Sequence, residues 1–167
     1  KTKYNLISVD NYSTGLRKNH IKSKRVKYIK SDTQNINKVL KNPKTIHSLF
    51  HFGEFARIYQ SFLKMEECIN SNTIGSNAVV NFCFSNKIKL IYSATSATIG
   101  NKWDDKNLSP YAFTKAKNLE LLDNLKKWFK FKFEIILISI IKFINNIQEI
   151  QISKKKWYYL LFVLNEI

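Results

Sequence analysis

Apolar runs along the chain alternate with polar, turn-forming residues at a regular rhythm. The runs that predict buried strands are 4–9, 26–32, 45–53, 87–95 and 131–139. Helical spacing of apolar residues is found between them, over 35–42, 55–72, 73–86 and 111–128. Strands that alternate with helices favour an α/β fold, in which a parallel sheet is flanked by helices on both faces.

The glycines add a second regularity, because each follows a predicted strand or lies at a predicted helix start: Gly15, Gly53, Gly75 and Gly100. Ligands of open α/β sheets bind outside the carboxyl ends of the strands, where loops must approach them closely. Glycines also simply mark turns. Both interpretations are compatible with this sequence.

The composition suits one domain, or most of one, because 167 residues with 44% hydrophobic content can form a core. The chain begins with Lys1 rather than methionine, which is compatible with a fragment. Its longest apolar run, 135–141, is too short to cross a bilayer, so we expect no membrane partner. Cys68 and Cys83 lack metal-binding or redox spacing, which favours reduced thiols and a cytoplasmic location.

The formal net charge of +16 raises the question of a nucleic-acid partner. The lysines, however, are spread over predicted loops and helix faces rather than gathered in one stripe. Arginine, the residue favoured for specific phosphate contacts, occurs only at positions 17, 25 and 57. We therefore expect no nucleic-acid partner, and a general preference for anionic small molecules.

His47 and His51 are four residues apart, a spacing that on a helix would suggest a metal site. On a strand this spacing places both on one face without a third ligand, and no nearby cysteine or carboxylate motif completes a site. We expect structural histidines and no metal.

Three predicted strand ends carry candidate chemistry. Asp10, followed by Asn11, ends the first strand, where a carboxylate can accept hydrogen bonds from a dinucleotide's adenosine ribose. A strand-ending Asx turn explains Asp10 equally well. Gly53 ends the third strand and would let the backbone pass close to a dinucleotide. Hydroxyl groups follow the fourth strand, where they would either orient a substrate or cap the chain: Ser93, Thr95, Ser96 and Thr98.

Tyr111 and Lys115 are one turn apart on a helix that begins after Ser109-Pro110. A phenol has a pKa of about 10 and is a poor base at neutral pH. A neighbouring ammonium group, together with a cationic nicotinamide ring, would stabilise the phenolate and bring it into a working range. Roughly one such spacing is expected by chance in a chain this rich in both residue types. Its position after the hydroxyl-rich strand end makes it the strongest catalytic candidate.

The chain resembles the extended short-chain dehydrogenases/reductases, and within them the nucleotide-sugar epimerases of the UDP-glucose 4-epimerase type. The matching motifs are VDNYSTG, HFGEFARIYQSF, NTIGS with Asn72, IYSATSATIG and SPYAFTKAKNLEL. The resemblance implies Tyr111 as catalytic base and acid, Lys115 as its partner, and Thr95 at the family's hydroxyl position. It also implies an NAD-binding set, in which Lys115 is joined by Asp10, Asn11, Asp32, Phe52, Gly53 and Asn72.

By the same resemblance, the implied reaction is transient oxidation of a nucleotide-sugar hydroxyl and its re-reduction from the other face, with NAD as the hydride carrier. A homodimer would be the family's assembly. Two alternatives stay open: a nucleotide-sugar dehydratase or reductase on the same scaffold, and a basic α/β binding module without catalysis.

The sequence departs from the family at both ends. The family's first strand and Gly-rich phosphate loop are missing, so we expect a Rossmann-like parallel sheet without its central strand. Residues 1–136 form the partial NAD-binding domain, and 137–167 form a divergent tail. The basic-aromatic stretch 154–164 has three interpretations: a membrane-surface or interface segment, a terminal strand or helix packed on the sheet, or the product of a shifted reading frame.

Overall fold

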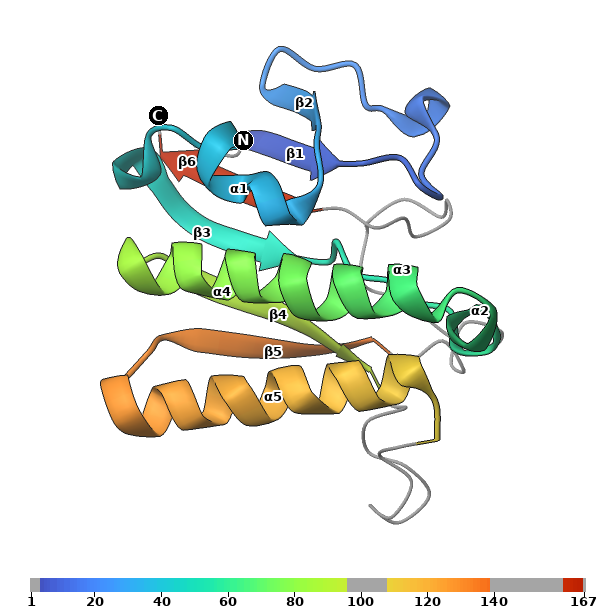
Figure 1. Ribbon diagram of the computed structural model, residues 1–167. Helices are drawn as coiled ribbons and strands as arrows, with labels where there is room; N and C mark the ends of the chain where they lie inside the picture. The colour runs from blue at the N-terminus through green and yellow to red at the C-terminus, as the bar shows by residue number, and fades with distance from the viewer. Residues whose placement is uncertain (1–3, 96–107, 139–160, 167) are drawn as a thin grey trace, which may run out of the picture.

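The computed structural model describes residues 4–95, 108–138 and 161–166. Its strands form one six-stranded sheet in the order β2-β1-β6-β3-β4-β5 (Figure 1). Their bounds are β1 Tyr4–Asp10, β2 Val26–Lys30, β3 Ile46–His51, β4 Lys89–Thr95, β5 Phe133–Ile138 and β6 Leu161–Glu166. The pairs β1–β2, β3–β4 and β4–β5 are parallel, as predicted.

The described helices are α1 Ile36–Val39, α2 Ile58–Leu63, α3 Met65–Ile69, α4 Ser76–Ser85 and α5 Pro110–Phe129. Short 3₁₀ turns occur at Arg17–Asn19, Thr33–Asn35 and Pro43–Thr45. The alternation of strands and helices confirms the predicted Rossmann-like α/β fold.

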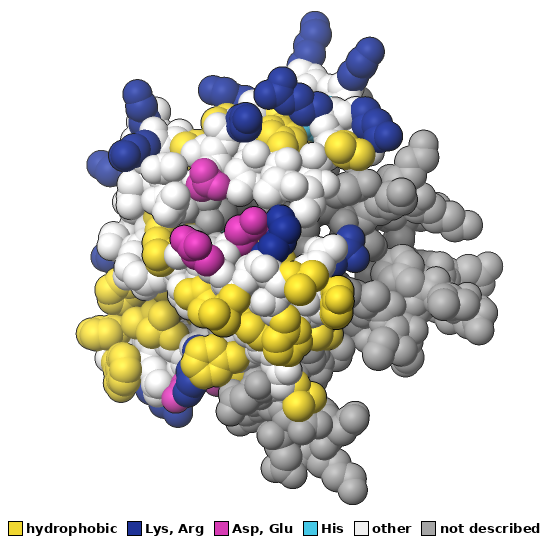
Figure 2. Space-filling model, turned by 45° about the vertical axis from the view of Figure 1, so that its right-hand side comes forward, with side chains coloured by type: hydrophobic (Ala, Val, Ile, Leu, Met, Phe, Trp, Pro, Cys, Tyr) yellow, Lys and Arg dark blue, Asp and Glu magenta, His cyan; other side chains and the backbone are white. Residues whose placement is uncertain are grey.

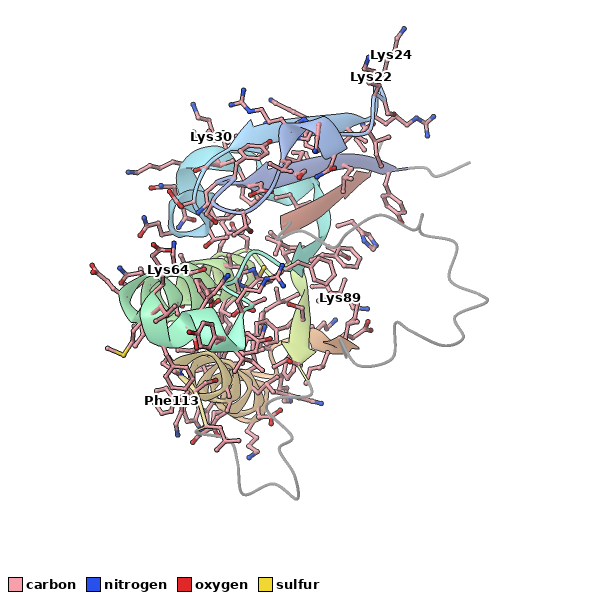
Figure 3. All side chains as sticks on the ribbon, turned by 90° about the vertical axis from the view of Figure 1, so that its right-hand side faces the viewer. Lys22, Lys24, Lys30, Lys64, Lys89 and Phe113 are labelled. Carbon is pink, nitrogen blue, oxygen red and sulfur yellow. The ribbon has the colours of Figure 1, made fainter. Side chains whose placement is uncertain are left out.

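All five described helices lie on one face of the sheet, which corrects the expectation of helices on both faces (Figures 1 and 3). The reason is the connection from β1 to β2, whose only helical piece is the turn Arg17–Asn19. This connection is polar and basic, and Lys22 and Lys24 extend from it into solvent (Figure 3). Without an apolar stripe, a helix in this connection would have nothing to bury against the sheet.

The centre of the sheet differs from the prediction of a missing central strand. β6 lies between β1 and β3 and is antiparallel to both. Its backbone pairs along the edges of β1 and β3, whose peptide groups would otherwise lack partners inside the sheet. Of the three interpretations of the tail, a terminal strand in the sheet describes residues 161–166, whereas 154–160 lie outside the described residues.

The core fills the space between the sheet and the helices α4 and α5. Its fully buried side chains include Leu49, Leu90 and Tyr92 from β3 and β4, with Val79 from α4 and Leu122 from α5. Each large apolar side chain buried in this way contributes roughly 1.5–3 kcal/mol. This layer fixes α4 and α5 relative to the carboxyl ends of β3 and β4.

The sequence predicts a boundary between two helices near Asn72, but the chain stays helical there. A π-helical segment, Asn70–Gly75, joins α3 to α4 without a break. A Cβ atom on Gly75 would overlap Thr33 Oγ1, so glycine allows the 3₁₀ turn after β2 to pack directly on this segment.

Candidate functional site

The carboxyl ends of β1, β2 and β3 border a cavity of about 330 Å³. The second wall comes from α2, α3 and the π-helical segment, through Arg57, Gln60, Lys64, Glu67 and Ser71. A cavity at this edge is where an open α/β sheet is expected to bind a ligand.

The predicted adenosine-binding residues Asp10, Asn11 and Asp32 line this cavity together. The side-chain amide of Asn11 donates to Asp32 Oδ1 at 2.7 Å, which links the ends of β1 and β2. Asp10 Oδ1 accepts the backbone N–H of Tyr12 at 2.8 Å, so the Asx turn is present as well. Burial raises the pKa of Asp10, although the Tyr12 hydrogen bond and His20 act in the opposite direction.

Gly53 lines the same cavity, whereas the neighbouring Phe52 ring stacks against Phe50 with 6.2 Å between ring centroids. A Cβ atom at Gly15 would lie 2.6 Å from Asp10 Oδ2, so a larger residue at this position would displace the Asp10 carboxylate. The fourth glycine, Gly100, lies outside the described residues, as do Ser96 and Thr98.

Tyr111 and Lys115 lie in the first turns of α5 and are both buried. The helix starts here because Ser109 Oγ accepts the backbone N–H of Ala112 at 3.0 Å and Pro110 occupies the first turn. The backbone N–H of Tyr111 donates to Ser61 Oγ of α2 at 3.3 Å. Thr95 is also buried, at the end of β4.

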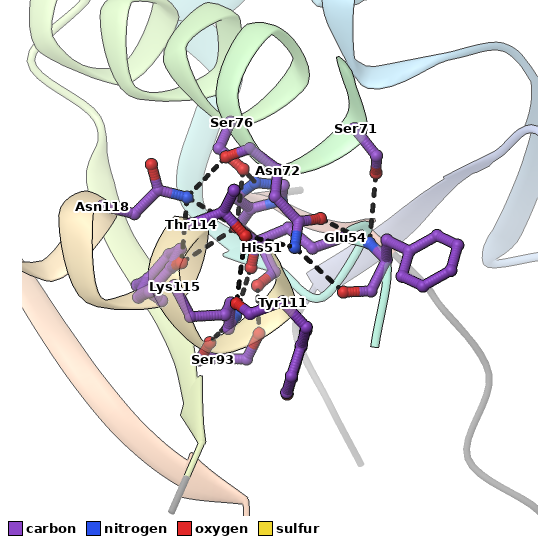
Figure 4. Close-up of polar contacts among 12 residues, drawn as sticks. His51, Glu54, Ser71, Asn72, Ser76, Ser93, Tyr111, Thr114, Lys115 and Asn118 are labelled. Atoms are coloured by element: carbon purple, nitrogen blue, oxygen red, sulfur yellow. Dashed lines mark hydrogen bonds and ion pairs between the residues drawn. The ribbon is translucent and has the colours of Figure 1, made fainter. Parts of the chain in front are cut away.

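The Lys115 ammonium group points into the protein, as Figure 4 shows. It forms an ion pair with the Glu54 carboxylate and donates to the carbonyl oxygen of Ser93 on β4. It also lies 4.4 Å from the centroid of the Tyr92 ring. The ammonium charge is therefore located at the carboxyl end of β4, next to the strand end that carries Thr95.

Glu54 is the residue that sequence reasoning missed. Besides Lys115, its Oε1 accepts hydrogen bonds from Ser76 Oγ at 2.6 Å, Tyr92 OH at 2.9 Å and Asn118 Nδ2 at 2.9 Å. Burial alone would raise the pKa of Glu54, but Lys115, His51 and the Ser76 hydrogen bond outweigh it and hold that pKa below its ordinary value. The available signal was a lone carboxylate between Gly53 and Phe55, directly after a buried strand.

His51 is fully buried at the end of β3, and its Nε2 atom lies 2.8 Å from Ser76 Oγ. Burial lowers the pKa of His51 to about 4, with Glu54 raising it and Lys115 lowering it further. His47, by contrast, is exposed, so the two histidines do not meet. Within the described residues there is no group of three or more His, Cys, Asp or Glu side chains that could hold a metal ion.

Asn72, a member of the NAD-binding set that the resemblance implies, uses its side chain to connect three parts of the protein. Its Oδ1 accepts the backbone N–H of Phe55 at 2.6 Å, and its Nδ2 donates to the Phe55 carbonyl oxygen and to Thr114 Oγ1, each at 3.0 Å. Asn118 donates to the Asn72 carbonyl oxygen at 2.6 Å. Asn72 thus holds the loop after β3 against α5.

The residues present match one end of NAD better than the other. Asp10, Asn11 and Asp32 offer acceptors and a donor for ribose hydroxyls beside a cavity. For the pyrophosphate, the described ranges 4–95, 108–138 and 161–166 contain no glycine-rich turn from a strand into a helix. The central strand β6 also runs in the opposite direction from one that would lead into such a turn, because Leu161, its first residue, pairs with Val9 and His51 at this edge.

No helix in the described part of the chain is both long enough and apolar enough to span a membrane. A search of curated proteins gives no match to this sequence.

Solved structures of UDP-sugar 4-epimerases share the fold. The UDP-Glc/GlcNAc 4-epimerase from Campylobacter jejuni superposes with a TM-score of 0.67 at 20% identity, covering 77% of this chain and 44% of that one. The UDP-glucose 4-epimerase from Thermus thermophilus, solved in complex with NAD, gives 0.65 at 20% identity, with 76% and 44% covered. The UDP-N-acetylglucosamine 4-epimerase from Methanobrevibacter ruminantium, in complex with UDP-N-acetylmuramic acid, gives 0.65 at 24% identity, also with 76% and 44% covered.

The chain therefore spans less than half the length of the solved epimerases to which it is similar. The family model described as NAD dependent epimerase/dehydratase family matches residues 1–139, which is most of the sequence. This chain belongs to the NAD dependent epimerase/dehydratase family.

Proposed function

We propose that the chain carries the adenosine-binding and proton-transfer parts of an NAD-dependent nucleotide-sugar epimerase. The observation that carries this proposal is the position of Tyr111 and Lys115. They lie one turn apart on α5, and Lys115 contacts the end of β4 through the Ser93 carbonyl oxygen. The proposed base, its cationic partner and a hydroxyl-bearing strand end are thus carried by the neighbouring elements α5 and β4. Glu54, the ion-pair partner of Lys115, also lines the ligand-sized cavity.

In the proposed reaction, Tyr111 takes the proton from a sugar hydroxyl and later returns it, while Thr95 hydrogen-bonds the same sugar oxygen. Lys115 provides the positive charge that favours the phenolate of Tyr111. NAD, when bound, supplies the hydride acceptor, with Asp10, Asn11 and Asp32 at its adenosine end. Phe52, Gly53 and Asn72 belong to the same proposed cofactor cleft.

The substrate partner is proposed to be a nucleotide sugar, since the solved structures with this fold are UDP-sugar epimerases. A homodimer is proposed through the apolar surface of α2 and α3, which carries the exposed side chains of Ile58, Tyr59, Phe62, Leu63 and Met65. Figure 2 shows hydrophobic side chains gathered on this side of the molecule. The buried free thiols of Cys68 and Cys83 are compatible with the proposed cytoplasmic location.

A binding module without catalysis is the second candidate. It is favoured by the commitment of the Lys115 ammonium group to Glu54. A dehydratase or reductase on the same scaffold would need further acid and base residues, for which no candidate is found in the sequence.

The two candidates are separated by calorimetric titration of the chain with NAD and with adenosine. The epimerase proposal expects NAD to bind, and Asp10→Ala to weaken the binding at least tenfold. Asp123→Ala, which removes an exposed carboxylate on α5, is the matched control and should leave binding unchanged. If the chain binds neither ligand, or if Asp10→Ala binds NAD as well as the wild type does, the proposed cofactor site is wrong.

A further inference from the structure

Glu54 is enclosed more completely than its role as one member of an ion pair requires. Its side chain is 2% exposed, and the side chain of Lys115 is 4% exposed. Three neutral donors, from α4, β4 and α5, hold the carboxylate in addition to Lys115. The carboxylate is therefore fixed by the scaffold, and the flexible lysine side chain is placed by it.

A buried ion pair contributes little net stability to a folded protein. Removing two charges from water costs several kcal/mol per ion, and apolar residues of similar size often serve as well. The pair here joins the loop after β3 to the helix that carries Tyr111. Its position one turn from Tyr111 indicates a role beyond packing.

We propose that Glu54 is the positioning residue of the Tyr111–Lys115 pair: it holds the Lys115 ammonium group against the Ser93 carbonyl oxygen at the end of β4. The assignment rests on the proposed function for its catalytic meaning. An ammonium group has three N–H donors. Glu54 and Ser93 accept from two of them, so the proposal requires only the third donor for a ligand hydroxyl.

The arrangement also sets the charge that the site presents. Glu54 and Lys115 together are neutral, so in the resting site Glu54 weakens the positive potential that the ammonium group produces at Tyr111. Any ligand that recruits the ammonium group must compete with a carboxylate that Ser76, Tyr92 and Asn118 already hold in place.

The test labels the lysine side chains of the whole chain with ¹⁵N and observes them by NMR. A buried, hydrogen-bonded ammonium group exchanges its protons slowly and gives a signal that solvent-exposed lysines lack. Lys115→Met assigns this signal by removing it. We expect Glu54→Gln to abolish the signal and Glu54→Asp, which keeps the charge, to retain it at a shifted position. Glu66→Gln, on the exposed surface of α3, should leave it unchanged.

A folded Glu54→Gln protein that keeps the wild-type Lys115 signal would overturn the proposal. If Glu54→Gln does not fold, the double variant Glu54→Gln/Lys115→Met decides, because it removes the unpaired charge. The proposal expects the double variant to fold. An equally unfolded double variant would mean that Glu54 acts through Ser76, Tyr92 and Asn118 instead, and would reject it.

This readout is independent of NAD. Loss of the signal in Glu54→Gln, in a chain that binds no NAD, would reject the proposed function and leave the Glu54–Lys115 assignment in place. NAD binding together with an unchanged Lys115 signal in Glu54→Gln would support the proposed function and reject the Glu54–Lys115 assignment.

Discussion

Two polar clusters lie at the carboxyl edge of the sheet, and they differ in how much of their hydrogen bonding is used inside the protein. In the first, Asn11 and Asp32 share one hydrogen bond at the rim of a cavity. In the second, Glu54 alone accepts from four side chains, including Lys115. The first cluster can exchange water for a ligand at small cost, whereas the second must give up protein contacts to do so.

Proximity to the expected ligand position therefore does not make a polar group available. The first cluster lies on loops and is open, and the second lies between α4, α5 and β4 and is closed. Four variants or conditions test this contrast.

The largest effect is expected for Lys115→Met, which leaves the Glu54 carboxylate buried without its cation. Breaking a buried pair in this way costs roughly 3–5 kcal/mol. Urea denaturation should show the loss as a lower midpoint. Lys117→Met, on the exposed side of the same helix, is the control. A loss below about 1 kcal/mol for Lys115→Met would contradict the closed character of the second cluster.

Acid should act mainly through His51 in the second cluster. Its pKa is lowered to about 4, so the folded protein keeps it neutral while the unfolded chain takes up a proton below about 6.5. Stability is therefore complete above a pH of about 6.5 and falls as the pH drops toward 4, by roughly 3 kcal/mol in total. Glu54, whose pKa is also lowered, adds a further loss once the pH falls through its folded value.

Urea midpoints measured between about pH 7 and pH 4 test this dependence. His51→Gln should flatten the decline between pH 6.5 and about 4, and the exposed His47→Gln should not. The same decline in wild type and His51→Gln would show that another group is responsible.

A smaller effect is expected for Gly75→Ala, at the wall of the open cavity. The added methyl group would overlap Thr33 Oγ1, so either the Thr33 side chain or one of the two segments must shift. Overpacking of this kind costs roughly 1–3 kcal/mol. Thermal denaturation should show that Thr33→Ala restores stability to the Gly75→Ala protein. No recovery in the double variant would mean that the π-helical segment rejects the methyl group for another reason.

The smallest effect is expected for Asn11→Ala, which removes two exposed hydrogen bonds, one donated to Asp32 and one accepted from the backbone N–H of Ser13. Stability should change by less than about 1 kcal/mol, while adenosine affinity measured by calorimetry should fall. A larger stability loss than that of Gly75→Ala would indicate that the first cluster is structural after all.

Local sequence patterns pointed to the open cluster more readily than to the closed one. Asn11 and its neighbour Asp10 could be proposed because a strand end, an acidic residue and a glycine follow each other locally. Tyr111 and Lys115 could be proposed from their spacing and from the Ser109-Pro110 helix start, both of which are also local. Glu54 pairs with a lysine 61 positions later, and no local pattern shows that contact.

The fold, too, was predictable where the pattern is local. Apolar runs predicted the strands and helices. The expectation of helices on both faces was wrong because the polar connection between β1 and β2 has no apolar stripe that a helix could bury against the sheet. The central strand was missed because residues 161–166 pair with β1 and β3, which are distant in sequence. The facing edges of β1 and β3 both need backbone partners. This need arises only when the whole sheet is assembled, so no single segment of the sequence reveals it.

The position of β6 also has a consequence for the order of folding. It is the last described strand along the chain, and it joins β1, the first, to β3 in the middle of the sheet. Contacts of such long sequence separation form slowly, because a large loop must close before they are gained. During synthesis, the two halves of the sheet would emerge from the ribosome with facing edges unpaired and would close only when residues 161–166 arrive.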